Sequence, residues 1–457
     1  MNLAHRILLI PTCSQAAYFK QACGTKRFVW NEALRAWNDQ FACAAEAAKA
    51  ASVVAKTEGL RKPTAKRFVK AAIDEVGGWP KTSVLKATFN EHKYYAFPWL
   101  EDIHRDAHSQ PFADLSDAFV RFRKGLAKRP KFKKKHRCRD SFYVANDKFE
   151  IDGKTIRLPI VGGVKLSEAL RFTGKIMSAT VSRTADKWFV SVSVETDTPR
   201  PVKFKKDGAT RCSAAPLLED QRRHVIGVDL GILHAVVTSA GVVYDAPKPL
   251  KHVLAKLRRL QRSQARRLTA GRKAFPKDKN YRSQNWKKGN QQLARLHTRA
   301  ARIRIDFVHK TTTDICRENQ AVVIEDLNVK GMLRNHCLAR ALSEAMFGEI
   351  RRQLAYKADI YGTRLLVADR WLPSSKKCSR CGVVGPGMDL SQRTFKCAAC
   401  GLKLDRDLNA SLNLENEYPR LEGNRHLRTG RRGSPLRSGK QPSLVETGTG
   451  RCALVHT

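Results

Sequence analysis

Three acidic residues stand at the ends of segments that the sequence predicts to be buried. Asp229 closes the apolar run 225–229, Glu325 closes the apolar run 321–325, and Asp407 lies in the first turn of an expected helix. Short apolar runs are typical of buried strands, which hold a terminal side chain on a rigid support. Two Mg²⁺ ions that bridge a phosphodiester need carboxylate oxygens at fixed positions. The acids therefore indicate a two-metal site for phosphodiester hydrolysis.

Each acid taken singly also has an ordinary explanation. An acid at the end of a strand is commonly a solvated loop group, and Asp405 or Asp407 could simply cap the expected helix. The combination favours a site, because three acids at the ends of buried elements in such a basic protein have no structural need to converge. No Ser-His-Asp or Cys-His arrangement is apparent in the sequence.

Four cysteines form two pairs at the spacing of a zinc ribbon. Two residues lie within each pair and fifteen lie between the pairs, which are Cys378 with Cys381 and Cys397 with Cys400. Two such knuckles present four thiolates to one tetrahedral Zn²⁺. A glycine follows each pair, where a tight turn needs its conformational freedom. Redox pairs or disulfides are the alternatives, but a closed four-thiolate site with one structural zinc ion is favoured.

The chain is strongly basic. Its 457 residues include 86 Lys and Arg against 42 Asp and Glu, a formal charge of +44. Such an excess causes self-repulsion unless a polyanion neutralises it, so nucleic acid is the expected partner. A solvated basic surface or a membrane-surface protein is the alternative. The excess recurs from Lys20 to Arg437 among segments that contain aromatic residues, which favours nucleic acid.

The apolar segments and the remaining cysteines predict a cytoplasmic protein. No stretch approaches the roughly 18 to 20 consecutive apolar residues of a membrane-spanning helix. The short apolar run 7–10 is followed by no small-residue cleavage site and is interpreted as a strand rather than part of a signal peptide. The other eight cysteines are scattered singly, which favours reduced thiols.

The elements that must position these residues change in type along the chain. Helical apolar spacing extends over 15–127, with breaks near Gly77 and around Pro98. A basic run from Lys128 leads into short alternating strands, the clearest at 155–158, 175–183 and 188–195. An α/β pattern follows from residue 222. Its expected strands are 225–229, 235–239, 242–244, 321–325 and 364–368, and its expected helices are a basic one starting near 250, then 291–315 and 342–361.

Four segments resemble, in order and spacing, the TnpB (OrfB) family of bacterial insertion sequences. They are Gly-Val-Asp-Leu-Gly at 227–231, Val-Ile-Glu-Asp-Leu-Asn-Val-Lys-Gly-Met at 323–332, Ser-Ser-Lys-Lys-Cys-Ser-Arg-Cys-Gly at 374–382 and Asp-Arg-Asp-Leu-Asn-Ala-Ser at 405–411. The start of the chain is also similar to that family. The resemblance thus spans nearly the whole sequence and is strongest from 225 to 415.

This resemblance implies a multidomain α+β protein whose nuclease domain has an RNase H-like (RuvC) α/β fold with an inserted zinc ribbon. A helical recognition domain and a small β-barrel-like (wedge) domain would precede it. The expected boundaries are 1–14 for the first wedge strand, 15–127 for the helical domain, 128–215 for the wedge and linker, 222–375 for the nuclease domain, 376–402 for the zinc ribbon and 403–420 for the last nuclease segment. The tail 421–457, rich in Gly, Ser, Arg and Pro, is expected to be disordered and basic.

The resemblance further implies a transposon-encoded, RNA-guided DNA endonuclease that cuts beside a short target-adjacent motif. Guide RNA and double-stranded target DNA would be its partners, and two Mg²⁺ ions and one Zn²⁺ its cofactors. The catalytic roles would pass to Asp229, Glu325 and Asp407. Asp405 also matches the family pattern, but the acid two residues before Asn409 is the one we assign.

Three other functions remain open at this point. A miniature type V CRISPR effector would share the architecture and the acids. A nuclease-silent RNA-guided repressor would be expected to lose at least one acid, and all three are present. A DNA-strand transferase would share the fold, so the fold alone does not exclude it.

Overall fold

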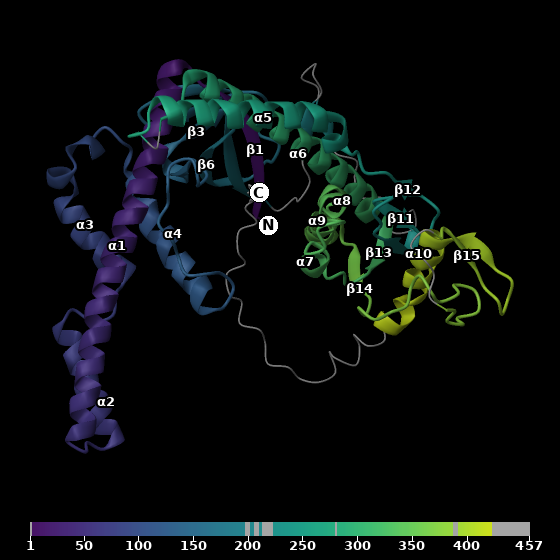
Figure 1. Cartoon of the computed structure of the whole chain (residues 1–457), viewed down its shortest axis with the longest axis horizontal. Helices are drawn as coiled ribbons and strands as arrows, with labels where there is room; N and C mark the ends of the chain where they lie inside the picture. The colour runs from purple at the N-terminus through teal and green to yellow at the C-terminus, as the bar shows by residue number, and fades with distance from the viewer. Residues whose placement is uncertain are drawn as a thin grey trace. The chain divides into compact units, whose positions relative to one another are not determined.

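The computed structural model describes residues 2–196, 202–204, 210–212, 223–278, 281–386 and 392–422. The chain divides at Pro199–Arg200 into two units, which are considered one at a time (Figure 1). Most of the predicted linker before residue 222 and most of the predicted disordered tail 421–457 lie outside the described residues. Among the helices of the described ranges, none is long and apolar enough to cross a membrane.

The first unit contains a seven-stranded antiparallel sheet in the order β2-β6-β7-β1-β5-β4-β3. The N-terminal strand β1 lies inside this sheet, paired with β7 on one side and β5 on the other. Its residues alternate between buried and less buried positions, as a strand covered on one face requires. The strands are β1 (Asn2–Ile10), β2 (Ser141–Ala145), β3 (Glu150–Asp152), β4 (Thr155–Leu158), β5 (Gly162–Leu166), β6 (Lys175–Thr184) and β7 (Lys187–Glu195).

The strands expected in this unit are present, with small differences at their ends. β4 has the predicted bounds, whereas β6 and β7 each extend one residue further toward the turn that joins them. The turn therefore contains only Ala185 and Asp186, and Ala185 adopts a left-handed conformation with φ of 55°. A two-residue hairpin turn requires a positive φ at one or both of its central residues.

Aromatic side chains join the first helix to one face of the sheet. Phe19, on α1 (Cys13–Thr57), is fully buried, with its ring 5.7 Å from that of Phe142 on β2 and 5.2 Å from that of Trp188 on β7. The start of the helix is fixed by Thr12, whose side chain accepts a hydrogen bond from the Gln15 amide in a capping box. The core of the unit thus forms where the beginning of α1 crosses the sheet.

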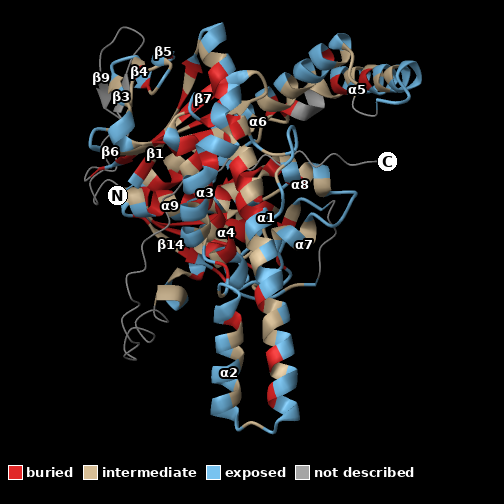
Figure 2. Cartoon of the chain, turned by 90° about the vertical axis from the view of Figure 1, so that its left-hand side faces the viewer, coloured by how far each residue is buried: buried red, intermediate tan, exposed pale blue. Residues whose placement is uncertain are grey.

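The predicted helical region consists of α1, α2 (Lys62–Glu75), α3 (Thr82–Ala96) and α4 (Arg105–Arg123), with a short 3-10 turn at Pro98–Leu100. The breaks predicted near Gly77 and Pro98 are present, and a further break between α1 and α2 was not predicted. The second half of α1 packs on α2 through small side chains, including Ala51 and Ala55. Figure 2 shows that this pair of helices is exposed over most of its surface.

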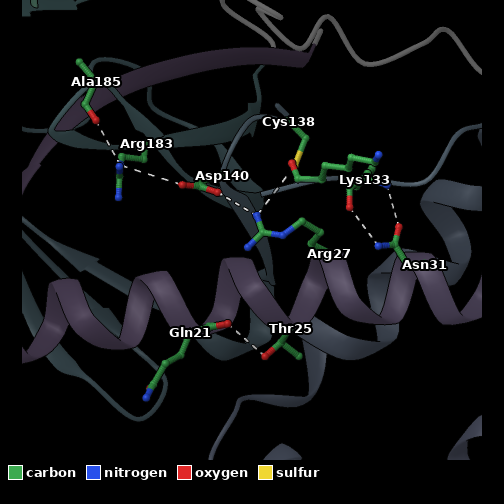
Figure 3. A network of polar contacts seen from close by, with 10 residues as sticks. Gln21, Thr25, Arg27, Asn31, Lys133, Cys138, Asp140, Arg183 and Ala185 are labelled. Carbon is green, nitrogen blue, oxygen red and sulfur yellow. Dashed lines mark hydrogen bonds and ion pairs between the residues drawn. The ribbon is translucent and has the colours of Figure 1, made fainter. Parts of the chain in front are cut away.

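The basic segment that precedes β2 is attached to α1. The Asn31 side chain donates to the Lys133 carbonyl at 3.0 Å and accepts from the Lys133 amide at 2.7 Å (Figure 3). The Lys133 ammonium lies 3.5 Å from the centre of the Trp30 ring, and burial lowers its pKa to about 8. Arg27 pairs with Asp140 at 3.1 Å. This part of the basic run is therefore a fixed surface of the first unit rather than a free arm.

The second unit is built around a five-stranded sheet in the order β12-β11-β10-β13-β14. β10 pairs antiparallel with β11, which pairs antiparallel with β12, whereas β10, β13 and β14 are parallel neighbours. The carboxyl ends of these three parallel strands consequently lie at one edge. The strands are β10 (Arg223–Asp229), β11 (Val236–Thr238), β12 (Val243–Tyr244), β13 (Asn319–Ile324) and β14 (Arg364–Val367).

Helices cover both faces of this sheet. Alternate residues such as Val228 and Ile324 pack on one face with α6 (Gln284–Glu318) and α9 (Phe347–Tyr361). The residues between them, such as Val323, face the other side and pack with Leu414 of α10 (Arg406–Asn416). Burial on both faces explains the continuous apolar runs of these strands. A separate basic helix, α5 (Pro249–Ala274), packs against α6.

One helix predicted in this unit is interrupted in the structure. Residues 342–361 were expected to form a single helix, but α8 (Ala339–Ala345) ends before Met346, and α9 begins after it. Met346 has φ of 56°, a left-handed conformation that interrupts the helical hydrogen bonds. The apolar spacing continues across the break because both helices face the same core, so periodicity alone did not reveal it.

Candidate catalytic site and metal centre

Two of the predicted acids lie side by side at the edge formed by the parallel strands. Asp229 is the last residue of β10, and Glu325 directly follows β13. The register pairs Val228 with Ile324, so the two acids occupy the next positions of neighbouring strands. Because both strands are parallel and buried, their ends hold these side chains on a rigid support.

The third acid is brought to this edge by close packing of α10 on β10. Gly227 makes the packing possible: a Cβ atom there would lie 1.9 Å from the Ser411 carbonyl oxygen and 2.6 Å from the Glu415 amide nitrogen. A Cβ on Gly231 would lie 3.9 Å from the Asp407 Oδ2 atom, which places that carboxylate beside the loop after β10. The helix therefore contacts the strand backbone directly. The signal in the sequence was a glycine inside an apolar strand, to which we had assigned no role.

The three carboxylates interact electrostatically. Burial raises the pKa of Asp229 well above its ordinary value, and the negative charges of Glu325 and Asp407 raise it further. The structure thus brings together the three acids that the sequence singled out. In the described part of the chain, the four cysteines form the group of His, Cys, Asp or Glu residues that could hold a metal ion, with all ligand atoms within 4.8 Å of one another.

Asp405 and Asp407 have different surroundings although they are two residues apart. Asp405 is the N-cap of α10, and its carboxylate accepts hydrogen bonds from the amides of Asp407 at 2.9 Å and Leu408 at 3.1 Å. The side chain of Asp407 instead lies near Asp229 and receives a hydrogen bond from the Arg406 Nε atom at 3.3 Å. The capping alternative thus applies to Asp405.

The four predicted cysteines form a compact cluster. The Sγ atoms of Cys378 and Cys400 are 3.6 Å apart, as are those of Cys381 and Cys397, and all four residues are free of disulfides. Backbone amides at the second knuckle, that of Cys400 first, lower the pKa of the Cys397 thiol to about 6, which favours a thiolate. The structure thus brings the four predicted cysteines together in a cluster that could hold one metal ion.

The turns of this cluster explain the two glycines that follow the cysteine pairs. Gly382 and Gly401 have φ values of 76° and 72°, in the left-handed region. Their amides donate to the carbonyls of Cys378 and Cys397, each at 3.0 Å. The short strands β15 (Thr394–Lys396) and β16 (Lys403–Asp405) flank the second knuckle, and β16 leads directly into α10.

A row of asparagines connects the cysteine module to the helix that carries Asp407. The Asn409 side chain donates to the Lys377 carbonyl at 2.8 Å and accepts from the Ser379 amide at 3.0 Å. Asn413 donates to the Ser374 carbonyl at 2.8 Å, and Asn416 to the Ser379 carbonyl at 3.0 Å. The sequence analysis missed these residues. The available signal was their spacing of four and then three residues, which places them on one helical face although asparagine has little intrinsic preference for helix.

Three segments of the chain match models of known protein families. Residues 1–45 match a family model described as a helix-turn-helix domain of the OrfB type, residues 190–336 one described as a probable transposase of the same type, and residues 347–414 one described as a Cas12f1-like TNB domain. A Streptomyces pristinaespiralis protein named "Putative RNA-guided DNA endonuclease" is 31% identical, over 99% of this chain and 95% of its own length. The chain belongs to the TnpB (OrfB) family.

A second relative and a solved structure are similar to most of this TnpB chain. The Escherichia coli K12 protein named "Putative RNA-guided DNA endonuclease InsQ" is 29% identical, over 69% of this chain and 75% of its own length. A solved structure of CasPhi-2 bound to crRNA is 12% identical, with a TM-score of 0.33 over 91% of this TnpB chain and 98% of that chain. The residues matched by the helix-turn-helix model form β1 and part of one unbroken helix, α1.

Proposed function

We propose that this protein is a transposon-encoded RNA-guided DNA endonuclease, with Asp229, Glu325 and Asp407 as its catalytic site. The observation that carries the proposal is the electrostatic interaction of these three carboxylates at the edge of the parallel strands. No structural requirement of the sheet or of α10 calls for them there, since Asp405 caps the helix. The names of the relatives supply the activity to be tested.

The sheet supports an RNase H-like (RuvC) nuclease fold. Its central strand β10 pairs antiparallel with a hairpin on one side and parallel with two strands on the other. This mixed arrangement, with helices on both faces, is what we expect of such a domain. The cysteine cluster lies between β14 and α10 in sequence, as an inserted zinc ribbon would. The domain boundaries and the wedge and recognition roles of the first unit remain proposals of the same kind.

The residues present fit a pair of divalent cations. Carboxylate oxygens are the ligands that Mg²⁺ prefers, and the raised pKa of Asp229 reports an excess of buried negative charge that cations would offset. Two ions about 4 Å apart do not require every carboxylate to lie close to every other, because acids on opposite sides can bind different ions. When bound, the ions would supply charge stabilisation to the phosphate being attacked. Asp229, Glu325 and Asp407 would hold them.

The protein's own contribution is to hold the acids in place. Asp229 ends the buried strand β10 and Glu325 directly follows the buried strand β13, which fixes both side chains, and the Ser374 hydroxyl donates a hydrogen bond to Glu325. One structural Zn²⁺, bound by Cys378, Cys381, Cys397 and Cys400, would keep the segment of Ser374 in position. Four thiolates leave no open coordination site on zinc, so this ion would take no part in the reaction.

Guide RNA and target DNA are the proposed partners. The formal charge of +44 provides the electrostatic affinity, and part of it is concentrated on α5, which contains nine Lys and Arg and no Asp or Glu. A miniature CRISPR effector is less well supported, because the match to a Cas12f1 endodeoxyribonuclease covers only 17% of this chain. The presence of all three acids argues against a nuclease-silent repressor.

The two acids at the start of α10, Asp405 and Asp407, provide the sharpest test. Protein purified with its guide RNA is given DNA that contains the matching target, and cleavage is compared for Asp407→Asn and Asp405→Asn. Asn caps a helix as well as Asp does, so Asp405→Asn should cut nearly normally, whereas Asp407→Asn should not cut. Asp229→Ala and Glu325→Ala should also abolish cutting, and all variants should still bind RNA and DNA. Cleavage by Asp407→Asn at the normal rate, or by RNA-free protein at the same site, would contradict the proposal.

A further inference from the structure

A pocket of about 530 Å³ lies beside Glu325, at the carboxyl ends of β13 and β14. Its wall includes Asp326, Arg351, Arg370 and Trp371. None of these four residues belongs to the proposed catalytic triad or to the cysteine cluster. The pocket is lined by charged groups and one large aromatic ring, which is the composition of a nucleic-acid contact rather than of an apolar ligand site.

Trp371 is held in an exposed position by a well-defined turn. Its side chain is 85% exposed. Its amide donates to the Asp369 side chain at 2.8 Å, and the Leu372 amide donates to the Asp369 carbonyl at 3.1 Å. Leu372 packs against the core beneath α10 and anchors the turn. A tryptophan left in water by a fixed backbone forgoes the stability that its burial would give, and such rings are typical of binding surfaces.

The charged groups of the pocket leave an excess of positive charge. Arg351, from α9, and Arg370, from the same turn as Trp371, each pair with Asp326 at 2.5 Å. Two guanidinium groups around one carboxylate retain a net positive charge, and each has further N–H groups that can donate to phosphate oxygens.

The pocket is connected to the proposed catalytic acid in two ways. Asp326 follows Glu325 directly in the chain. The turn that carries Trp371 continues into Ser374, whose amide donates to the Leu372 carbonyl at 2.8 Å and whose hydroxyl donates to Glu325. The aromatic ring and the two arginines are thus fixed relative to the acid. A strand whose phosphate lies at Glu325 would place a neighbouring nucleotide at this pocket.

We propose that this pocket binds the single-stranded DNA next to the bond that is cut, with a base stacked on Trp371 and a phosphate held by Arg351 and Arg370. The inference rests on the proposed function, since it assumes that DNA is cut at Glu325. Stacking on an exposed ring accepts any base, which suits an enzyme whose sequence choice comes from a guide. Guide RNA at the same pocket is the competing outcome that the experiment must separate.

The test uses the guide-loaded protein and DNA that contains 2-aminopurine, whose fluorescence falls when it stacks. In an Asp229→Ala background, the probe is placed at successive positions on either side of the cut. One position should be quenched, the quenching should be lost in Trp371→Ala and it should be kept in Trp371→Phe. In protein that retains Asp229, Trp371→Ala should raise KM for DNA about tenfold, as expected for the loss of one stacked base.

Matched controls address folding and charge. Arg351→Ala should also raise KM, whereas Arg352→Ala, the next residue on α9, which pairs with Glu349, should not. Unchanged zinc content and guide affinity in Trp371→Ala would show an intact fold. If the unchanged protein cuts DNA normally but no probe position is quenched, the stacking site alone is overturned. The stacking site is also overturned if Trp371→Ala loses affinity for the guide RNA while its KM for DNA is unchanged. Quenching combined with a failure of the unchanged, guide-loaded protein to cut DNA would overturn the proposed function and leave the stacking site supported.

Discussion

Ser374 donates a hydrogen bond to Glu325, 49 residues earlier in the chain. The carbonyl of the same serine accepts from Asn413 on α10, the helix that carries Asp407. Ser374 also lies four residues before Cys378, the first ligand of the cysteine cluster. One residue therefore connects two of the proposed catalytic acids to the metal cluster. This arrangement would make the proposed zinc site part of the support for the proposed catalytic acids, although it lies outside the triad.

Replacement of Ser374 by Ala should slow DNA cleavage by roughly 10- to 100-fold, the usual cost of removing a partner that orients a metal ligand. The remaining activity should need a higher Mg²⁺ concentration, because Glu325 would no longer be held in one orientation. The measurement is the single-turnover cleavage rate as a function of Mg²⁺. Ser375→Ala, a change at the exposed neighbour, is the control and should be nearly silent. A normal rate and a normal Mg²⁺ dependence in Ser374→Ala would show that the hydrogen bond has no role.

Loss of one cysteine ligand should release the segment that contains Ser374. A closed four-thiolate site contributes its binding energy to folding, so Cys397→Ser should reduce the zinc content from about one ion per chain and loosen both knuckles. Hydrogen exchange at residues 374–379 should then become faster, and cleavage should fall. Cys316→Ser, at a buried cysteine outside the cluster, is the control for zinc content. The structural role is wrong if undamaged protein contains no zinc.

The positions of the candidate acids and cysteines could be predicted from the sequence, and the contacts that support them could not. Asp229 and Glu325 could be predicted because apolar runs locate buried strands, and the knuckles because cysteine spacing reflects a local geometry. The contact of Gly227 with α10 joins segments that are about 180 residues apart in the chain, and periodicity carries no information about such a pairing. The break in the helix at Met346 was not predicted for a related reason, because the residues on both sides of the break pack into the same core.

Acid should destabilise the first unit through His108. Burial, together with the smaller effect of the positive charge of Lys93, lowers the pKa of this α4 side chain to about 4. Both ring nitrogens are buried without a hydrogen-bond partner. In the unfolded chain His108 binds a proton at its ordinary pKa near 6.5. Its contribution to the free energy of unfolding is therefore fully present above that pH and is lost as the pH falls toward 4.

The thermal unfolding temperature should therefore fall less steeply with pH in His108→Leu than in the unchanged protein. His92→Leu, on α3, alters an exposed histidine and serves as the control. Differential scanning fluorimetry between pH 7 and pH 4.5 measures both. Parallel curves for His108→Leu and the unchanged protein would show that His108 does not set the acid sensitivity.

The packing of α10 on β10 can be tested at Gly227. An added methyl group would meet the Ser411 carbonyl oxygen at 1.9 Å, and backbone atoms of a packed helix cannot move aside as a flexible side chain can. Gly227→Ala should therefore displace α10, cost at least the 1–3 kcal/mol that is usual for overpacking, and abolish cleavage by moving Asp407. Gly348→Ala is the matched control, because that glycine lies on α9 with nothing within 4 Å of its added Cβ. In a helix this change should be neutral or stabilise the protein by about 0.5–1 kcal/mol. Chemical unfolding and cleavage are measured on both variants. If Gly227→Ala were as stable and as active as Gly348→Ala, direct contact between helix and strand would not be what positions Asp407.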